Sequence, residues 1–521
     1  MTLFRAAATV GGFTMVSRVL GFVRDVMMAE VLGAGPVSDA FFVALRLPNM
    51  FRTLFAEGAF SAAFVPVFTR RLAADGSEGA RRFAEQALSI LVAALLLTVL
   101  LAEAFMPQLI PVIAPGFTDK PDQFALATAL TRITFPYLLF ISLASLQSGI
   151  LNSLDRFAAA AITPALLNVF QIGGLIWSRR FGDATETLSW CVTAGGVAQF
   201  LWLAFSCARA GMALRLHWPR VTDEMRRLGR LMAPGIFGAG VTQINLLVST
   251  SVASELAAGS ISYLNWADRL NQLPLAIIGT AVGTAILPTL SRQLRGDDQS
   301  AAMETQNRGI EMALLLTIPA AVALMVIAGP IVWVLFRHGN FDAAAAAGTA
   351  SALTAYAAGL PAFVLVKVLV PAFYARHDTR TPVRVGVVSL IVNIALIFAL
   401  AGPFHHVGNA IATSVAGWIN MLSLAWLLHR RRHLALDARS RRRLPRIAAS
   451  AIAMALVLAG AAALAAPYIH AGGILLPYAA LAVLVGLGLA AYAGFALLFG
   501  AGSLADLKRL VRRRRPAAAN S

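Results

Sequence analysis

The sequence predicts an all-α polytopic membrane protein. We expect fourteen transmembrane helices, arranged as two pseudo-symmetric six-helix lobes around a central cavity, with two extra helices at the C-terminus. Three observations lead to this prediction. Of the 521 residues, 58% are hydrophobic and only 13% are charged, about half the charged fraction of a typical soluble domain. Apolar runs of about 20 residues recur along the chain, and an internal repeat spans six of them.

The apolar runs define fourteen predicted spans, with boundaries accurate to about 2–4 residues. Several contain proline, which a membrane helix tolerates where neighbouring helices or water satisfy the freed carbonyl groups. In chain order the predicted spans are 8–30, 38–68, 85–108, 125–150, 160–178, 187–208, 230–251, 260–290, 309–336, 345–374, 383–401, 407–428, 446–466 and 473–500.

Basic residues predict the direction of these spans. Loops after even-numbered spans are rich in arginine, and the richest is HRRRHLALDARSRRRLPR at residues 429–446. Loops after odd-numbered spans carry few basic residues, with Arg179 and Arg180 as the exception. Because cytoplasmic loops hold the excess of Lys and Arg, both termini are predicted to be cytoplasmic. The basic tail KRLVRRRRP at residues 508–516 fits the same leaflet.

The internal repeat has a period of 222 residues. AFVPVFTRRL at residues 63–72 returns as AILPTLSRQL at residues 285–294. A weaker echo links residues 154–168 with residues 377–393. Since six spans separate the copies, both have the same orientation, as in transporters whose two halves rock about a shared site. The predicted division is therefore an N-lobe (1–220, spans 1–6), a C-lobe (221–440, spans 7–12) and a C-terminal part (441–521, spans 13–14 and the tail).

Polar residues gather on one face of several predicted spans. In SRVLGFVRD, residues 17–25, the polar side chains lie within about 120° of a helical wheel. Span 8 behaves in the same way, and span 2 is also polar. The candidate residues are Ser17, Arg18, Arg24 and Asp25 in span 1, Asp39, Arg46 and Arg52 in span 2, and Asp268, Arg269 and Gln272 in span 8.

Two structural explanations compete with a functional one. The arginines could pair with Asp25, Asp39, Glu57 and Asp268 and simply hold helices together, or Arg18 and Arg52 could reach the membrane interfaces. These explanations fit single arginines better than the whole set. Guanidinium groups suit bidentate contacts with phosphate, and lysine is nearly absent from the spans, Lys367 being the exception. The pattern favours a polyanionic ligand.

Several function classes fit poorly. The formal net charge is +18, but the basic residues lie between apolar runs, so nucleic-acid binding is not expected. Cys191 and Cys207 form no metal-ligand pattern, and no metal or other cofactor is expected. No nucleotide-binding P-loop motif occurs. A membrane glycosyltransferase or polymerase would need paired carboxylates or a catalytic loop, and no loop is long enough to form a domain. A scaffolding protein would have no reason to bury arginines.

Three stretches resemble the MurJ (MviN) family of lipid II flippases, in the multidrug/oligosaccharidyl-lipid/polysaccharide exporter superfamily. They are SRVLGFVRD, DAFFVALRLPNMFRTLFAEGAFSAAFVPVF at residues 39–68 and WADRLNQLPLAIIGTAVGTAILP at residues 266–288. The resemblance implies movement of an undecaprenyl-pyrophosphate-linked peptidoglycan precursor from the cytoplasmic to the periplasmic leaflet by alternating access. It also implies that the two extra helices form a groove for the polyprenyl tail.

The resemblance assigns roles to the candidate residues. It implies that Arg18, Arg24, Arg52 and Arg269 bind the pyrophosphate and sugar region, with Ser17, Asp25 and Asp39 in support. We add Arg46, Asp268, Gln272 and Lys367 as further supporting candidates. Gln272 stands where family members often have glutamate, and residues 232–250 contain no carboxylate where some relatives bind sodium. Membrane potential is therefore favoured over a sodium site as the driving force.

The resemblance further implies a monomer in the bacterial inner membrane, surrounded by membrane lipids and in contact with the cell-wall synthesis machinery. Two alternatives of the same class stay open. One is a flippase for another polyprenyl-linked glycan, and the other is a multidrug exporter of the superfamily. A drug exporter would be expected to carry acidic and aromatic residues in its cavity because its substrates are cations.

Overall fold

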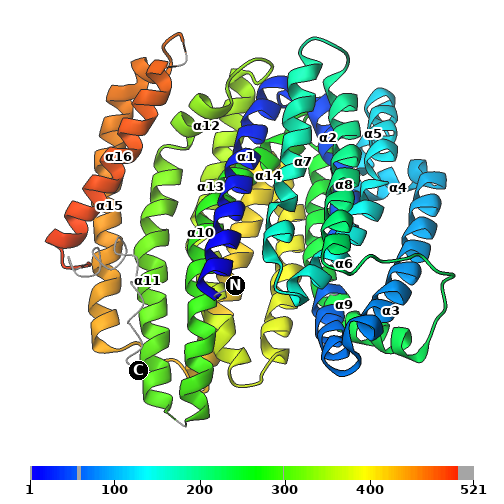
Figure 1. Ribbon diagram of the computed structural model, residues 1–521. Coiled ribbons are helices and arrows are strands. Elements are labelled where there is room, and N and C mark those ends of the chain that lie inside the picture. Colours follow the sequence, from blue (N-terminus) through cyan, green and yellow to red (C-terminus); the bar gives the residue numbers. More distant parts are fainter. Residues whose placement is uncertain (1–2, 55–59, 297, 474, 503–521) are drawn as a thin grey trace. The chain divides into compact units, whose positions relative to one another are not determined.

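The computed structural model describes residues 3–54, 60–296, 298–473 and 475–502 (Figure 1). Within these residues every regular element is a helix. The elements are α1 (Leu3–Leu32), α2 (Pro36–Phe51), α3 (Ser61–Ala104), α4 (Met106–Ile113), η2 (Pro115–Phe117), α5 (Pro121–Thr134), α6 (Tyr137–Ser153), α7 (Phe157–Ser178), α8 (Ala184–Arg209), α9 (Asp223–Glu255), α10 (Ser260–Arg295), α11 (Gln299–Val326), α12 (Ala328–Phe336), α13 (Ala343–Tyr374), α14 (Arg380–Arg430), α15 (Ala438–Ile469) and α16 (Leu475–Leu498).

Local sequence explains where several helices begin and break. Asp183 accepts hydrogen bonds from the backbone N–H of Thr185 and Glu186 at the start of α8, which satisfies groups that have no partner inside the helix. Helix α3 breaks at Gly76, where φ is 67°, a conformation that glycine adopts without steric cost. Helix α14 breaks at His405, where φ is 50°. Each of these long helices therefore consists of two helical segments.

The chain forms two compact units. Unit 1 contains Met1–Ser262 and Phe336–Ala345, and unit 2 contains Tyr263–Leu335 and Ala346–Ser521. The core of unit 1 includes stacked phenylalanines, with the rings of Phe60 and Phe68 lying 5.1 Å and 5.5 Å from that of Phe64. The core of unit 2 joins α10, α11, α13 and α14 through residues such as Leu290 and Phe373. Compact units need not coincide with functional lobes, so the predicted division at residues 220 and 440 stays a prediction.

Each unit contains one copy of the same turn, which supports the internal repeat. Asp155 and His377, 222 positions apart, are both left-handed, with φ of 58° and 60°. In each turn the following N–H closes a bond to the carbonyl five residues earlier, Arg156 to Leu151 and Asp378 to Phe373. This 6→1 bond is the Schellman arrangement that ends a helix. The repeat detected from short sequence echoes is therefore present in the backbone.

A second matching feature lies where helices pack. In unit 1 the hydroxyl of Thr193 donates to the carbonyl of Ile133, and in unit 2 the hydroxyl of Ser414 donates to that of Ala355. The offsets, 221 and 222 positions, match the repeat period. Hydroxyl groups that bond across helices are a common way to join membrane spans. The two copies thus share packing contacts as well as turns.

Ten helical segments in the described residues are long and apolar enough to cross a membrane. The predicted count of fourteen is not confirmed. Helices α1, α2 and α10 are not among the ten, and these are the helices that carry most of the candidate charged residues. Two further expectations, a partner role for Glu57 and the membrane-surface tail at residues 508–516, fall outside the described residues.

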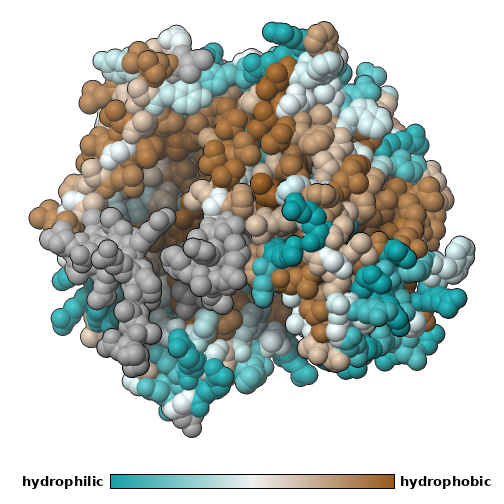
Figure 2. Space-filling view, in the orientation of Figure 1, coloured by the Kyte–Doolittle hydropathy of each residue, from teal (hydrophilic) through white to brown (hydrophobic). Residues whose placement is uncertain are grey.

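The surface of the helices is apolar over large areas, as the brown regions of Figure 2 show. On α15 and α16, which run side by side in Figure 1, Leu464 and Leu489 are 79% and 69% exposed. Such a surface in water would be unfavourable, and an exposed apolar patch of this kind is a membrane or partner contact. With the many apolar helices, it indicates a multi-pass membrane protein.

The loop between α13 and α14 provides a pH-dependent contact outside the spans. Asp378 accepts hydrogen bonds from the hydroxyl and N–H of Thr381 at 2.6 Å and 2.9 Å, and from Arg431 at 2.6 Å. The bond from the Thr381 hydroxyl, followed by that from Arg431, holds the pKa of Asp378 well below its usual range. The resulting stabilisation is present above the ordinary Asp pKa of about 4 and is lost as pH falls towards the lower folded value.

We therefore expect Asp378→Asn to lower the free energy of unfolding by about 1.5 kcal/mol at neutral pH. Thermal unfolding of the purified protein at a series of pH values measures this difference. The gap between wild type and variant should stay constant down to about pH 4 and narrow below it. A gap that is the same at every pH would show that the charge of Asp378 does not stabilise this loop.

Candidate functional site

A polar cluster joins α1 to α7 inside unit 1. Arg24 donates from Nε and Nη2 to Asp25 Oδ1, at 3.0 Å and 2.6 Å. It also donates from Nη1 to the side-chain oxygens of Asn168 and Gln171, at 2.8 Å and 3.1 Å. The side chains of Arg24 and Asp25 are each 13% exposed. The guanidinium group is therefore held in a fixed orientation between the two helices.

The same cluster includes the backbone of Ser17. Asn168 donates from Nδ2 to the carbonyl of Ser17 at 3.0 Å and lies next to Gly21. Since a guanidinium group has five N–H donors, the four bonds of Arg24 leave one available. A phosphate that binds Arg24 would use this donor and displace neutral amide oxygens, which are weaker acceptors than a charged one. The predicted residues Ser17, Arg24 and Asp25 are thus brought together.

Asp39 forms a separate buried site in unit 1. Its carboxylate, in a residue only 2% exposed, accepts from the N–H of Gly259 at 2.6 Å and from the N–H and hydroxyl of Ser262 at 2.8 Å and 2.5 Å. The hydroxyl of Ser38 lies 2.7 Å from that of Ser262. Asp39 therefore closes the turn that follows α9, rather than pairing with an arginine as one structural explanation proposed.

Removing this acceptor should be costly because it leaves buried donors without partners. We expect Asp39→Ala to destabilise unit 1 by about 3 kcal/mol, and Asp39→Asn to destabilise it less because the amide keeps one oxygen. Hydrogen exchange of Gly259 and Ser262 in the purified protein checks this directly. The exposed Asp122, replaced by Ala, is the control. Equal protection of the turn in wild type and Asp39→Ala would contradict the assignment.

The remaining candidates of unit 1 lie elsewhere on α1 and α2. Arg46 donates from Nε to the hydroxyl of Thr250 on α9 at 2.9 Å. Arg52 is half-buried and lies at the C-cap of α2. Arg18 is exposed on α1. Arg18 and Arg24 are six positions apart, so they lie about 120° from each other around the helix.

The candidates of unit 2 lie on α10 and α13. Gln272 donates to Asp268 one helical turn away. Arg269, which follows Asp268 in the sequence, is exposed. The side chain of Lys367 on α13 packs against Gly279. A side-chain carbon at Gly279 would lie 2.8 Å from Lys367 Cδ. Gly279 and Gly283 form a small-residue pair of the kind that lets membrane helices approach closely. Asp268 is thus hydrogen-bonded to Gln272, the residue that stands where family members often have glutamate.

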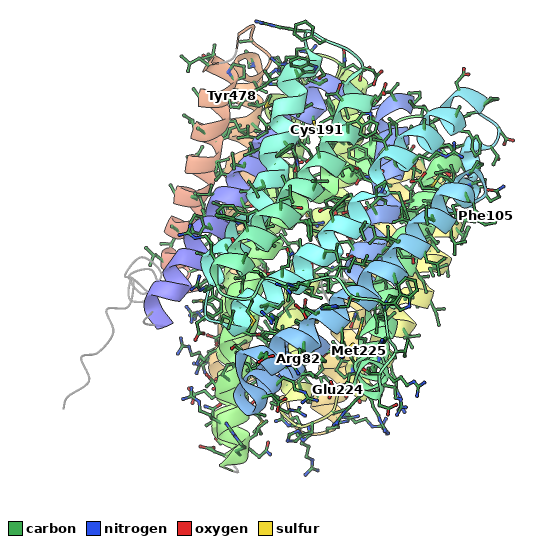
Figure 3. All side chains as sticks on the ribbon, turned by 45° about the vertical axis from the view of Figure 1, so that its right-hand side comes forward. Arg82, Phe105, Cys191, Glu224, Met225 and Tyr478 are labelled. Atoms are coloured by element: carbon green, nitrogen blue, oxygen red, sulfur yellow. The ribbon has the colours of Figure 1, made fainter. Side chains whose placement is uncertain are left out.

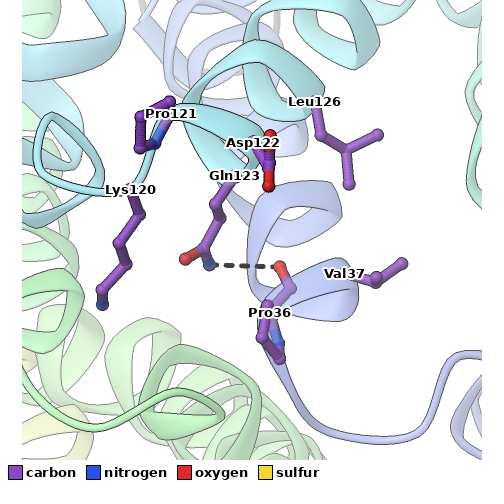
Figure 4. Close-up of a pocket in the computed structure, with 7 residues that line it drawn as sticks. All are labelled: Pro36, Val37, Lys120, Pro121, Asp122, Gln123 and Leu126. Carbon is purple, nitrogen blue, oxygen red and sulfur yellow. Dashed lines mark hydrogen bonds between the residues drawn. The ribbon is translucent and has the colours of Figure 1, made fainter.

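One pocket in unit 1 has a volume of about 330 Å³ and lies at the N-termini of α2 and α5 (Figure 4). Its lining residues are Pro36, Val37, Lys120, Pro121, Asp122, Gln123 and Leu126. Gln123 donates to the carbonyl of Pro36 at 3.1 Å across it. None of the predicted site residues lines this pocket. In the described residues no group of three or more His, Cys, Asp or Glu side chains could hold a metal ion.

Sequence reasoning missed the residues that hold the predicted ones. Asn168 and Gln171 are polar residues three positions apart in an otherwise apolar helix, and this spacing places them on one face. That signal was available in the sequence. Thr250 and Ser262 gave no comparable signal, since isolated hydroxyl residues are common in membrane helices and usually bond to their own backbone.

Comparisons with known proteins agree over the whole chain. A family model described as "Lipid II flippase MurJ" matches residues 28–482. The chain is similar to a "Probable lipid II flippase MurJ" of Rhizobium tropici, with 41% identity over 100% of this chain and 98% of that one. A protein of the same description from Rhizobium meliloti is 42% identical over 98% of this chain and 97% of its own length.

Solved structures show the same fold. A structure titled "Lipid II flippase MurJ, inward closed conformation" has a TM-score of 0.79 and 26% identity, and the match covers 96% of this chain and 99% of that one. An inward-facing multidrug resistance MATE family transporter of the MOP superfamily has a TM-score of 0.69 at 14% identity, covering 82% of this chain and 98% of that one. The second likeness concerns the fold alone.

Proposed function

The chain belongs to the MurJ family of lipid II flippases, and we propose that it moves lipid II from the cytoplasmic to the periplasmic leaflet of the bacterial inner membrane by alternating access. It is a lipid II flippase, a transporter rather than an enzyme. The observation that carries this assignment is identity above 40% with curated lipid II flippases over essentially the full length of both chains. The direction of movement, the mechanism and the orientation with both termini in the cytoplasm are the parts that we propose.

We propose that Arg24 contacts the pyrophosphate of lipid II. Its guanidinium group is fixed by Asp25, Asn168 and Gln171, so little side-chain entropy is lost when a ligand binds. One N–H is available, and the two amide oxygens are exchangeable partners. Asp25 balances the charge in the absence of substrate. Ser17, through its carbonyl, sets the position of Asn168.

The other arginines extend this proposal. Arg18 and Arg269 are exposed on α1 and α10, and their planar groups suit bidentate contacts with phosphate oxygens. We propose that they and Arg52 bind the pyrophosphate and the adjoining sugar. Arg46, Asp268, Gln272 and Lys367 support the shape and charge of the binding surface. Asp39 supports this site indirectly, because it closes the turn after α9.

The alternative functions are less well supported. A multidrug exporter binds cations, and the candidate residues on α1, α2 and α10 include five arginines against three aspartates. A flippase for another polyprenyl-linked glycan would share the pyrophosphate site. The close relatives, which cover the full chain, are named for lipid II. The comparison therefore favours lipid II over another glycan.

We propose that the membrane potential contributes to transport. Moving one elementary charge across a potential of 100 mV changes the free energy by about 2.3 kcal/mol, and an anion leaving a negative interior gains this energy. The part of α9 between Met232 and Thr250 contains no carboxylate, so this helix offers no charged ligand for sodium. We further propose that the protein acts as a monomer, surrounded by membrane lipids and close to the cell-wall synthesis machinery.

Depletion of the protein in cells tests the function. We expect lipid II to become inaccessible to an enzyme that cleaves it from the periplasmic side, while the total amount of lipid II is maintained. Restoring the protein should restore cleavage. Unchanged accessibility after depletion would overturn the assignment. Loss of accessibility of a different polyprenyl-linked glycan, with lipid II unaffected, would support the alternative flippase instead.

A further inference from the structure

The connection between α8 and α9 is fastened to α3 by hydrogen bonds. We define it as the strap, residues 211–222. The N–H of Arg215 donates to Glu85 Oε1 at 3.1 Å, and the ring Nε2 of His217 lies 3.1 Å from Glu85 Oε2. The N–H of His217 donates to the hydroxyl of Ser89 at 3.0 Å. Glu85 and Ser89 are buried and one turn apart on α3, so the strap has a fixed register on this helix.

The strap exposes apolar side chains. His217 is held on α3 through its N–H and its ring. Its neighbours Leu216 and Trp218 are 63% and 84% exposed, and Val221 is 65% exposed. The start of the strap is anchored in the core, since Met212 is 2% exposed. The exposed apolar side chains therefore lie on a segment that is anchored to α3.

The strap lies where a membrane surface is expected. Helix α3 continues beyond Ser89 into a segment whose Leu97 and Leu100 are 60% and 66% exposed, as in a lipid-facing span. Figure 3 places Arg82 and Met225 at one end of unit 1 and Phe105 at the far end of α3. Glu85 and Ser89 thus lie between the polar part of α3, which contains Arg82, and the apolar part of the same helix.

The charge of the strap selects the kind of membrane surface. Residues 209–222 include Arg209, Arg215 and Arg220 and no Asp or Glu. Arginine near an anionic leaflet is attracted to the lipid phosphates, and tryptophan is enriched at the boundary between headgroups and acyl chains. Interfacial binding strengthens with both buried apolar area and this attraction.

We propose that the strap docks on the anionic headgroup region of the bilayer, with Leu216 and Trp218 inserted at the headgroup boundary and Arg215 and Arg220 bound to lipid phosphates. The strap fixes the height of α3 and of the start of α9 relative to the membrane. This role rests on the fixed register set by Glu85 and Ser89. It is separate from substrate binding, because no predicted site residue lies in the strap.

A site-specific probe tests the proposal in the full-length protein reconstituted in vesicles. Leu216→Cys, in a Cys191→Ser background, carries a thiol-reactive fluorophore, while the buried Cys207 stays unlabelled. Glu78→Cys, exposed on the polar part of α3, is the matched control. We expect a nitroxide near the lipid headgroup to quench the probe at position 216 and not at position 78. Quenching should be stronger in phosphatidylcholine mixed with phosphatidylglycerol than in phosphatidylcholine alone.

Two added substitutions separate the apolar and charged contributions. Trp218→Ser should move the probe towards water and raise its quenching by aqueous iodide. Arg220→Gln should weaken the effect of phosphatidylglycerol on docking of the strap. The loss of one arginine should lower the apparent equilibrium constant for docking by about fivefold. Equal iodide quenching at positions 216 and 78 in every vesicle would overturn the proposal and leave the face available to a protein partner.

Discussion

Replacing Arg24 by alanine is expected to abolish lipid II transport while the protein remains folded in the membrane. The variant loses the cation that we place on the pyrophosphate and removes the ion pair between Arg24 and Asp25. A charge-assisted contact of about 3 kcal/mol corresponds to a loss of roughly a hundredfold. Complementation of a depleted strain, together with the amount of protein in the membrane, measures the effect. Full complementation by Arg24→Ala would return this residue to a structural role.

Two companion variants sharpen this test. Asn168→Ala removes one amide that orients Arg24 but keeps the charge, so we expect reduced transport rather than complete loss. Arg82→Ala changes an arginine that is 72% exposed and pairs with Glu78, and it should leave transport unchanged. A loss in Arg82→Ala equal to that in Arg24→Ala would indicate a general requirement for basic residues instead of a site.

The second large effect is expected at Glu311, which joins α11 to α15 in unit 2. The residue is 3% exposed. It accepts from Arg308 Nη1 at 2.9 Å, from the hydroxyl of Ser440 at 2.7 Å and from Arg443 Nη1 at 3.0 Å. Arg443 is largely buried, with 13% of its side chain exposed. Without Glu311 the guanidinium group of Arg443 would lose this carboxylate in a poorly solvated place.

We therefore expect Glu311→Ala to lower the free energy of unfolding by about 3–5 kcal/mol, the usual result of removing one partner from a buried ion pair. Thermal unfolding in detergent measures the change. Glu304→Ala is the matched control, since Glu304 pairs with the same Arg308 but is 66% exposed, and its effect should stay below about 1 kcal/mol. Equal melting of the two variants would contradict the assignment of Glu311.

The sequence predicted the features that depend on local pattern. Apolar runs predicted a helical membrane protein, and two short echoes located a repeat whose turns at Asp155 and His377 then proved equivalent. The wheel of residues 17–25 correctly grouped Ser17, Arg24 and Asp25 on one side of α1. These properties follow from helical periodicity and turn chemistry, both of which involve residues a few positions apart.

Contacts between distant residues could not be predicted in this way. Arg24 is held by Asn168 and Gln171, which are 144 and 147 positions away, and Asp39 is satisfied by Ser262, 223 positions away. Periodicity shows which face of a helix is polar but not which helix covers it. The competing explanation in which Asp39 pairs with an arginine does not hold, because this buried carboxylate is satisfied by backbone N–H groups and a hydroxyl.

Titrating the purified protein with lipid II and with an analogue that carries the same sugar and peptide on an uncharged lipid link measures the charge selectivity of the site directly. If arginines bind the pyrophosphate, wild type should bind lipid II at least about tenfold more tightly than the analogue. Arg24→Gln and Arg269→Gln should each reduce that preference, as expected when a charge-assisted contact is lost. Equal affinity for both lipids, or a preference that both variants retain, would contradict this role of the arginines.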